Sequence, residues 1–373
     1  MNRGVGGGIV FLVSSTLTRA RADRGLGARL VGDGTPLVIL TGLALVLAGT
    51  VALLLAASGQ FLPHDSAYLG MSADQLCSLD DCRIVRFMVH DRAAFGGTLM
   101  AIGVLYAWLA RFPLCRGEAW AWWTLAVSGA LGFASFLDYL GYGYLDTWHA
   151  IATLALLPTF TIGLVLSRRL LVGARDPLVL LRPGRPDGWA GRGGIGRGLL
   201  VLTGLGMVTA GLTILVVGAT AVFVPQDLIF MGLTPADMSA LNPHLVPLIA
   251  HDRAGFGGGL ATTGVAVLCC AWCATPSRGL WATLLVAGSV GFGTAVGIHL
   301  VVGYLDLSHV GPAIAGAAVF AVGIALFPRR APLADRTGSP ELVDPPGLVG
   351  QSSSPWAEAV GSPSRGRGSS PGP

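Results

Sequence analysis

The chain has 373 residues, of which 53% are hydrophobic and only 12% are charged. A soluble domain carries about 25% charged residues, so the composition excludes a soluble protein and indicates one that lies in a lipid bilayer. All 24 basic residues are Arg. The absence of Lys excludes a retinal protein and any enzyme that depends on a Schiff-base lysine. The sequence also contains no nucleotide-binding loop, no Ser-centred catalytic elbow and no basic face for nucleic acid.

Eight apolar runs follow one another along the chain. Each is long enough to cross about 30 Å of hydrocarbon, which takes about 20 helical residues. The runs lie near 37–57, 92–110, 119–140, 148–167, 199–224, 254–275, 280–302 and 310–327. We therefore expect an all-α polytopic membrane protein with about eight transmembrane helices, arranged as two tandem four-helix bundles in parallel orientation.

The segments around these runs set the predicted domain boundaries. Residues 1–36 form a basic N-terminal segment, whose short apolar run followed by Arg is not typical of a signal peptide. The two membrane units are 37–169 and 198–330, and the Arg-, Pro- and Gly-rich stretch 170–197 links them. Residues 331–373 are rich in Pro, Ser and Gly without apolar periodicity, which predicts a disordered tail.

The distribution of Arg predicts the orientation of the chain in the cell membrane. All Arg except Arg83, Arg86, Arg92 and Arg253 fall on one side of the predicted topology. Because short loops rich in Arg stay in the cytoplasm, we expect both termini and the linker to be cytoplasmic. All seven His fall on the outer side or at the outer ends of helices. The bilayer is the expected partner, and nothing in the sequence indicates a protein partner.

The two membrane units arise from an internal duplication. The sequence HDRAAFGG at 90–97 returns as HDRAGFGG at 251–258, GYLDTWH at 143–149 as GYLDLSH at 303–309, and FLPHD at 61–65 as FVPQD at 223–227. Several matches at nearly one offset indicate a tandem repeat. Because each unit has an even number of helices, the two units keep the same orientation, related by an axis along the membrane normal.

Each unit has a long outer loop after its first helix. In these loops Ser72-x-x-Gln75 and Thr234-Pro235-x-Asp237 resemble capping boxes, which predicts a short surface helix in each loop. Cys77 and Cys82 both lie in the first outer loop, where oxidation is permitted, and we expect them to form a disulfide.

Small residues inside the predicted spans indicate close helix packing. These are the pairs Gly96-Gly97 and Gly257-Gly258, one turn after each HDR motif, and the Gly293-x-x-x-Gly297 motif of the seventh helix.

The repeated polar motifs are the candidate site. They lie at the outer boundary of the second and fourth helices of each unit, at similar depth, and Asp146 and His149, three residues apart, share a helical face. We expect one outward-facing polar site per unit. The candidate ligand-binding residues are His90, Asp91, Arg92, Asp146 and His149 in the first unit, and His251, Asp252, Arg253, Asp306 and His309 in the second.

Three interpretations of these motifs stay open. Imidazole and carboxylate groups suit a transition-metal ion, for which the candidate ligands are His90, His149, His251 and His309. Two His at one depth could instead hold haem b between helices, with Arg near its propionates. In the structural interpretation, Arg92 pairs with Asp146 and Asp91 with His149, which joins the second helix to the fourth. The spacing matches no metalloenzyme signature, so whether the protein is an enzyme stays open.

The combination of HDR-A-x-F-G-G, FLPHD and GYLD-x-x-H resembles uncharacterised multi-pass membrane proteins of high-GC bacteria, over about residues 37–330. The resemblance implies no activity. We consider three functions: a membrane protein that binds a metal, haem or small ligand at its outward polar sites, a permease for a small solute through the interface between the units, and a non-catalytic accessory subunit.

Overall fold

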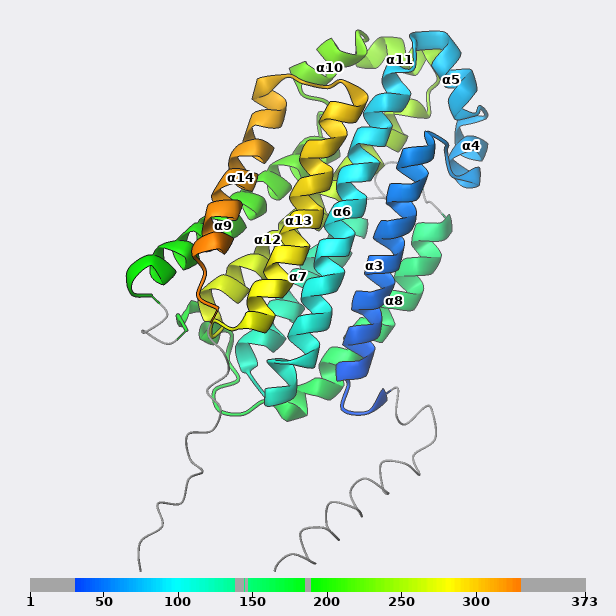
Figure 1. The fold of residues 1–373 in the computed structure, drawn as a ribbon. Coiled ribbons are helices and arrows are strands. Elements are labelled where there is room, and N and C mark those ends of the chain that lie inside the picture. The colour runs from blue at the N-terminus through cyan, green and yellow to red at the C-terminus, as the bar shows by residue number, and fades with distance from the viewer. Residues whose placement is uncertain (1–30, 138–143, 145–146, 185–188, 330–373) are drawn as a thin grey trace, which may run out of the picture. The chain divides into compact units, whose positions relative to one another are not determined.

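The computed structural model describes residues 31–137, 144, 147–184 and 189–329. In this part of the chain it contains twelve α-helices and no strand, so the protein is all-α (Figure 1). The predicted N-terminal segment and tail lie almost wholly outside the described residues.

Eight long helices form the body of the protein. They are α3 (Thr35–Ser58), α6 (Arg83–Arg111), α7 (Ala119–Leu137), α8 (Thr147–Ser167), α9 (Gly191–Ala219), α12 (Leu245–Cys273), α13 (Arg278–Val302) and α14 (Leu307–Leu326). All of these except α7 are long and apolar enough to cross a membrane, and α7 occupies the place of the remaining predicted span.

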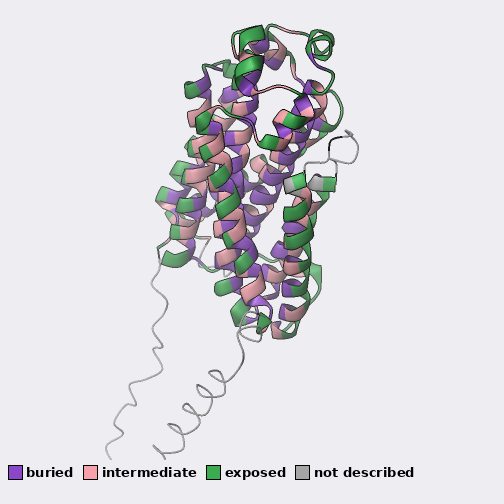
Figure 2. Cartoon of the chain, turned by 90° about the vertical axis from the view of Figure 1, so that its right-hand side faces the viewer, coloured by how far each residue is buried: buried purple, intermediate pink, exposed green. Residues whose placement is uncertain are grey.

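Large apolar side chains cover the outside of these helices. Leu47, Leu154 and Val301 are 65%, 75% and 80% exposed. Exposed positions run along the length of the helices in Figure 2 rather than only at their ends. A surface of this kind is stable in hydrocarbon and not in water. The chain is therefore a multi-pass membrane protein.

Four short helices gather at one end of the bundle, which we call the loop-helix end (Figure 1). They are α4 (Pro63–Leu69), α5 (Ala73–Asp80), α10 (Pro225–Met231) and α11 (Pro235–Leu241). The two predicted capping boxes begin α5 and α11. The backbone amide of Gln75 donates to Ser72 Oγ at 3.2 Å, and the backbone amide of Ser72 donates to the side-chain oxygen Oε1 of Gln75 at 2.7 Å. Thr234 and Asp237 make the equivalent pair of bonds.

The helix α9 begins seven residues before the predicted start of the second unit, inside the segment predicted as linker. Arg197, the last residue of the predicted linker, lies in this helix and is fully buried rather than exposed. Its guanidinium donates to the carbonyl oxygens of Ala271, Trp272 and Ala274 at 2.6, 2.8 and 2.7 Å. Arg197 thus satisfies the last carbonyls of α12, which have no partner within their own helix.

The two units share a common interior. The central helices are α6 and α12. In the most apolar stretch of each, 78% and 67% of the residues are buried. The helix α6 packs against α3 of its own unit and against α13 of the other, while α12 packs against α9 and, in the other unit, α7. Because α6 and α12 also contact each other, the two four-helix units join into one bundle.

The repeated Gly pairs explain how the central helices pack on both sides. The first Gly of each pair faces a helix of its own unit: a Cβ on Gly96 would lie 2.9 Å from the Gly49 carbonyl oxygen, and one on Gly257 would lie 2.8 Å from that of Gly211. The second Gly faces the other unit. Gly97 lies against the Thr294 side chain of α13.

On the other side of the interface, Gly258 lies against the Ser135 side chain of α7. The prediction for the Gly293-x-x-x-Gly297 motif is wrong, because a Cβ on either residue would meet no atom within 4 Å. Gly293 and Gly297 therefore do not mediate close packing among the described helices of this chain.

Candidate functional site

The two HDR motifs lie on the central helices near the loop-helix end, so their polar side chains are buried. The exposed fractions of His90, Asp91, His251 and Arg253 are 3%, 1%, 1% and 4%. Charged groups in such surroundings are stable only when they are paired. The pairs they form define the site.

Arg92 connects three elements. Its guanidinium lies 2.8 Å from Asp65 of α4 and 2.8 Å from Asp252 of α12. Asp65 also accepts a hydrogen bond from the Tyr144 hydroxyl at 2.6 Å and one from the backbone amide of Leu62 at 3.3 Å. The carboxylate of Asp65 therefore holds its loop helix against α6.

Arg253 repeats this arrangement in the second unit. It forms an ion pair with Asp227 of α10, its Nε lies 3.7 Å from Asp91 Oδ2, and it donates to the Val222 carbonyl at 3.0 Å. Asp227 accepts from the Tyr304 hydroxyl at 2.9 Å. Each Arg is thus paired with the Asp of its own loop helix and the Asp of the other unit's HDR motif.

The predicted pairs lay within one unit. In the structure, the Arg of each HDR motif instead pairs with the Asp of the HDR motif in the opposite unit. The predicted partners within the first unit cannot be placed: Asp146 lies outside the described residues, and so does the side chain of His149. The sequence places Asp65 or Asp227 of the outer loops at this end of the bundle, but it did not lead us to assign Tyr144 or Tyr304 to the site. The repeated GYLD motif that contains them was the available signal.

Asp306 does not enter the site. It is exposed and precedes α14, where its carboxylate accepts hydrogen bonds from the backbone amides of Ser308 and His309, both at 3.0 Å. The hydrogen bond from the Ser308 hydroxyl, followed by these amides, lowers the pKa of Asp306. Its role is to cap the helix that carries His309.

Three His from three helices meet at the buried end of this network. His90 of α6, His299 of α13 and His309 of α14 each offer a ligating atom, and these atoms lie within 4.8 Å of one another. The Nε2 atoms of His90 and His299 are 3.1 Å apart. His90 and His309 were predicted as ligands, but His299 was not, because a single His near the end of an apolar helix carries no motif.

The other ring nitrogen of each His faces an acceptor. His90 Nδ1 lies 3.0 Å from Asp91 Oδ1, and His299 Nδ1 lies 2.6 Å from the Ala295 carbonyl oxygen. His309 Nδ1 lies 3.8 Å from Asp227 Oδ1. A carboxylate or carbonyl opposite Nδ1 selects the tautomer that has its proton on Nδ1. The Nε2 atoms of His90 and His299 then face each other as two lone pairs.

A cavity of about 680 Å³ extends away from the three His. Residues of α6, α9, α12, α13 and α14 line it, with His90, His299, His309, Asp91 and Arg253 at one end. The remaining walls are mostly apolar, including Ala210, Gly291 and Phe320. An apolar cavity with a few polar groups gathered at one end is the usual form of a binding site for a small molecule.

Among the described residues, the second HDR motif has no three-His cluster like the one around His90. His251, the counterpart of His90, has its ring centroid 5.0 Å from that of Tyr144. Alignment of the two GYLD motifs places Tyr139 at the position of His299, and Tyr139 lies outside the described residues. Within the described ranges, His90, His299 and His309 are the one group found with metal-ligand spacing.

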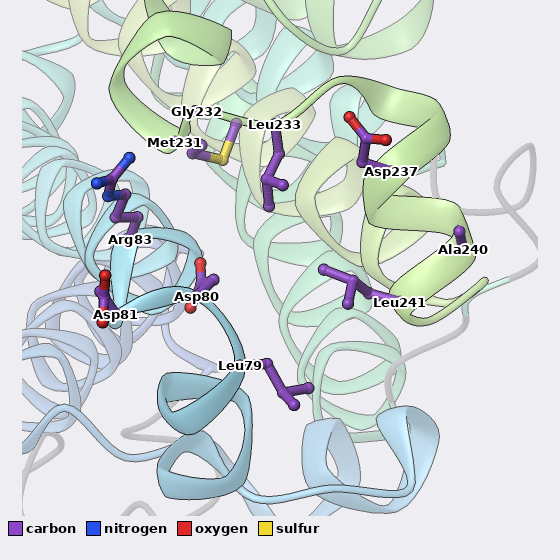
Figure 3. A pocket seen from close by; sticks show the side chains of 10 residues that line it. All are labelled: Leu79, Asp80, Asp81, Arg83, Met231, Gly232, Leu233, Asp237, Ala240 and Leu241. Carbon is purple, nitrogen blue, oxygen red and sulfur yellow. The ribbon is translucent and has the colours of Figure 1, made fainter.

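A second cavity, of about 530 Å³, lies between the loop helices of the two units (Figure 3). Asp80, Asp81 and Arg83 line one side, and Met231 to Leu233 and α11 line the other. The Cys77–Cys82 disulfide closes the turn that contains Asp80 and Asp81. Burial raises the pKa of Asp80, while the backbone amide of Ile84, which donates to Asp80 Oδ2 at 2.6 Å, acts in the opposite direction.

Comparisons of the chain with protein-family models, with curated proteins and with solved structures found no match.

Proposed function

We propose that this membrane protein binds a transition-metal ion through His90, His299 and His309 at the loop-helix end of the bundle. The observation that carries the proposal is the contact between the Nε2 atoms of His90 and His299, 3.1 Å apart, while both Nδ1 atoms face acceptors. Two lone pairs at this distance repel each other unless a cation lies between them. A metal ion satisfies both nitrogens and the third His together.

The geometry suits Zn²⁺ or a similar ion. Zinc binds imidazole at about 2.0–2.1 Å, which places two ligands of a tetrahedral site about 3.3 Å apart. Metal-binding His usually donate the other ring N–H to a carboxylate or a backbone carbonyl, as His90 donates to Asp91 and His299 to Ala295. Three protein ligands leave one position open, which is the arrangement of catalytic zinc sites.

The same distance argues against haem. A haem held by two His needs its macrocycle between their ligating atoms, but the Nε2 atoms of His90 and His299 are only 3.1 Å apart and their ring centroids 4.4 Å apart. Of the two cofactors considered from the sequence, the metal ion therefore has the better support.

The orientation that we propose places the site outside the cell, with both termini in the cytoplasm. The helix α6 runs from the loop-helix end, where His90 lies, to Arg111, and Arg116, Arg168 and Arg169 follow in the short 3₁₀ turns Leu114–Arg116 and Arg168–Leu170. Because Arg-rich turns stay cytoplasmic, the His cluster faces the exterior. A membrane-impermeant maleimide should label a Cys115→Ser, Ser239→Cys variant in intact cells, since Ser239 is exposed on α11 and Cys115 is the exposed free thiol of the described residues; labelling only after lysis would reverse the orientation.

Metal binding tests the proposal. The full chain, purified in detergent and stripped with a chelator, is titrated with Zn²⁺, and bound metal is measured by mass spectrometry after gel filtration. We expect one ion per chain. The variants His90→Ala, His299→Ala and His309→Ala should each lower the affinity by at least about tenfold.

The duplication supplies a matched control for this experiment. His251 occupies the position of His90 in the second HDR motif but does not join the cluster. The His251→Ala variant should therefore retain one ion at unchanged affinity. Equal loss in His251→Ala and His90→Ala, or no stoichiometric metal in the unmodified protein, would contradict the proposal.

The cavity favours a permease as the second candidate function. It reaches along α12 from Arg253 to Val267, which is about 21 Å at 1.5 Å per residue and more than half of the hydrocarbon thickness. A permease should release a trapped small solute from vesicles at a rate that a Gly291→Leu substitution in the cavity wall abolishes. Identical release by empty vesicles and by vesicles with the protein would remove this candidate.

A further inference from the structure

The cavity extends well beyond the three His, and its walls offer few polar groups. The hydroxyls of Thr98, Thr203 and Thr263 lie in or along its walls, but each donates to a carbonyl of its own helix, at 2.8, 2.9 and 3.0 Å. Threonine that bonds in this way presents its methyl group to its surroundings. Away from the His cluster the cavity therefore suits a hydrocarbon chain.

Several lining residues of the cavity on α9 and α14 are exposed, from which we infer that the cavity opens to the outside of the bundle along these helices. Among its lining residues, Leu202, Gly206 and Thr213 of α9 and Pro312 and Ala315 of α14 are exposed. These positions lie within the membrane-spanning parts of both helices. An occupant can therefore enter sideways from the bilayer, which favours a lipid-soluble molecule over a water-soluble one.

The polar end of the cavity has an acceptor without a donor. Asp91 lines the cavity and is 1% exposed, yet its Oδ2 accepts no hydrogen bond, and the nearest cationic atom is Arg253 Nε at 3.7 Å. A buried carboxylate oxygen left in this way is costly, so an occupant that donates a hydrogen bond there would be favoured. A hydroxyl group can donate to Asp91 and turn its own oxygen toward the three His.

We propose that the cavity binds a long-chain alcohol drawn from the bilayer, with its chain between α9, α13 and α14 and its hydroxyl donating to Asp91 Oδ2. The contact between the alcohol oxygen and the open metal position rests on the function proposed above. The chain site and the Asp91 hydrogen bond need no metal.

Photolabelling tests the assignment. The full chain in phosphatidylcholine nanodiscs is irradiated with hexadecanol that carries a diazirine in its chain, and labelled peptides are identified by mass spectrometry. Labels should appear on α9, α13 and α14 at cavity positions. Unlabelled hexadecanol should compete about tenfold better than hexadecane, since only the alcohol satisfies Asp91.

Two Gly of α13 supply a matched pair of variants. Gly291 lines the cavity, and a Cβ there would lie 3.8 Å from Ala101 Cβ, whereas Gly293 is exposed and a Cβ there meets nothing within 4 Å. The Gly291→Leu variant should lower cavity labelling to background, and Gly293→Leu should leave it unchanged. Circular dichroism and gel filtration of both variants establish that they fold.

The outcomes separate this inference from the metal site. Unchanged labelling in folded Gly291→Leu, or equal competition by hexadecanol and hexadecane, would overturn the alcohol site. If the protein binds no metal but the labelling pattern holds, the proposed function fails and the alcohol site stands. If metal binds and labelling is absent, the reverse is true.

Discussion

At the scale of single residues, Asp227 shows how one carboxylate fixes several elements. It is fully buried, pairs with Arg253 of α12, accepts from the Tyr304 hydroxyl at 2.9 Å, and accepts from the Val224 amide at 2.8 Å at the start of α10. Burial, followed by the nearby Asp227 carboxylate, raises the pKa of the Tyr304 phenol, so Tyr304 stays a donor throughout the physiological range.

The Asp227→Asn variant should be strongly destabilised. It keeps the shape of the side chain but leaves Arg253 with only the more distant Asp91, and breaking a buried ion pair costs about 3–5 kcal/mol. Thermal unfolding of the protein in detergent measures the effect. The Asp306→Asn variant is the control, because Asp306 is an exposed cap, and it should unfold close to the unmodified protein. Equal losses in the two variants would contradict the assigned roles.

Replacing Asp80, unlike replacing Asp227, should stabilise the protein, and the effect should depend on pH. Because burial raises its pKa in the folded protein above that of the unfolded chain, the ionised carboxylate destabilises the fold at neutral pH, and this penalty disappears as pH falls through the two pKa values. The Asp80→Asn variant can still accept from the Ile84 amide, so it should melt at a higher temperature than the unmodified protein at pH 7.

The advantage of Asp80→Asn should vanish once the pH lies below the ordinary pKa range of Asp. Melting curves of both proteins across pH 3 to 8 (about five units) test this sign directly. A variant that is less stable than the unmodified protein at pH 7 would show that the carboxylate is favourably bound.

At the scale of elements, hydrophobic run length predicted all eight long helices. The spans and the capped loop helices depend on local sequence. A span needs about 20 apolar residues, and a capped loop helix needs a Ser or Thr at its start and, three residues later, a side chain that accepts a hydrogen bond from the backbone amide of that Ser or Thr. The start of α9 was missed, because Arg197 reads as a linker residue until its bonds to three carbonyls of α12 are seen. Likewise, Gly293 and Gly297 have the spacing of a packing motif but face open space.

Contact between α9 and α12 depends on Gly211. A Cβ on this residue would lie 2.7 Å from the Gly257 carbonyl oxygen, which is backbone and cannot move aside. The Gly211→Ala variant should therefore lose about 1–3 kcal/mol of stability through overpacking. Gly198 of the same helix has no atom within 4 Å of a Cβ, and Gly198→Ala should be neutral or slightly stabilising, since Ala favours helix. Equal melting temperatures for the two variants would contradict this packing.

At the scale of the whole molecule, the duplicated units exchange partners, and this could not be predicted from the sequence. The repeat fixes what each unit contains but not which unit supplies the neighbours of a motif. The sequence therefore grouped His90 with His149 of its own unit. In the structure His90 meets His299 and His309 of the other unit, because the second Gly of each pair, such as Gly97, packs against the opposite unit.

This exchange predicts that two equivalent substitutions have different effects on metal binding. Gly97→Val would push α6 away from α13 and so separate His90 from His299, which should lower the Zn²⁺ affinity by about tenfold or more. Gly258→Val strains the equivalent contact with Ser135 of α7, where none of the three His lies. It should lower stability to a similar degree and leave affinity unchanged. Equal affinities in the two variants would show that the cluster does not depend on the α6–α13 contact.

X-ray absorption spectroscopy of the Zn²⁺-loaded full chain tests whether three imidazoles from two units hold one metal ion. We expect a first shell of nitrogen and oxygen at about 2.0–2.1 Å with the multiple-scattering pattern of three imidazoles, which falls to two in His299→Ala. A shell containing sulfur, or an imidazole contribution that His299→Ala leaves unchanged, would contradict it.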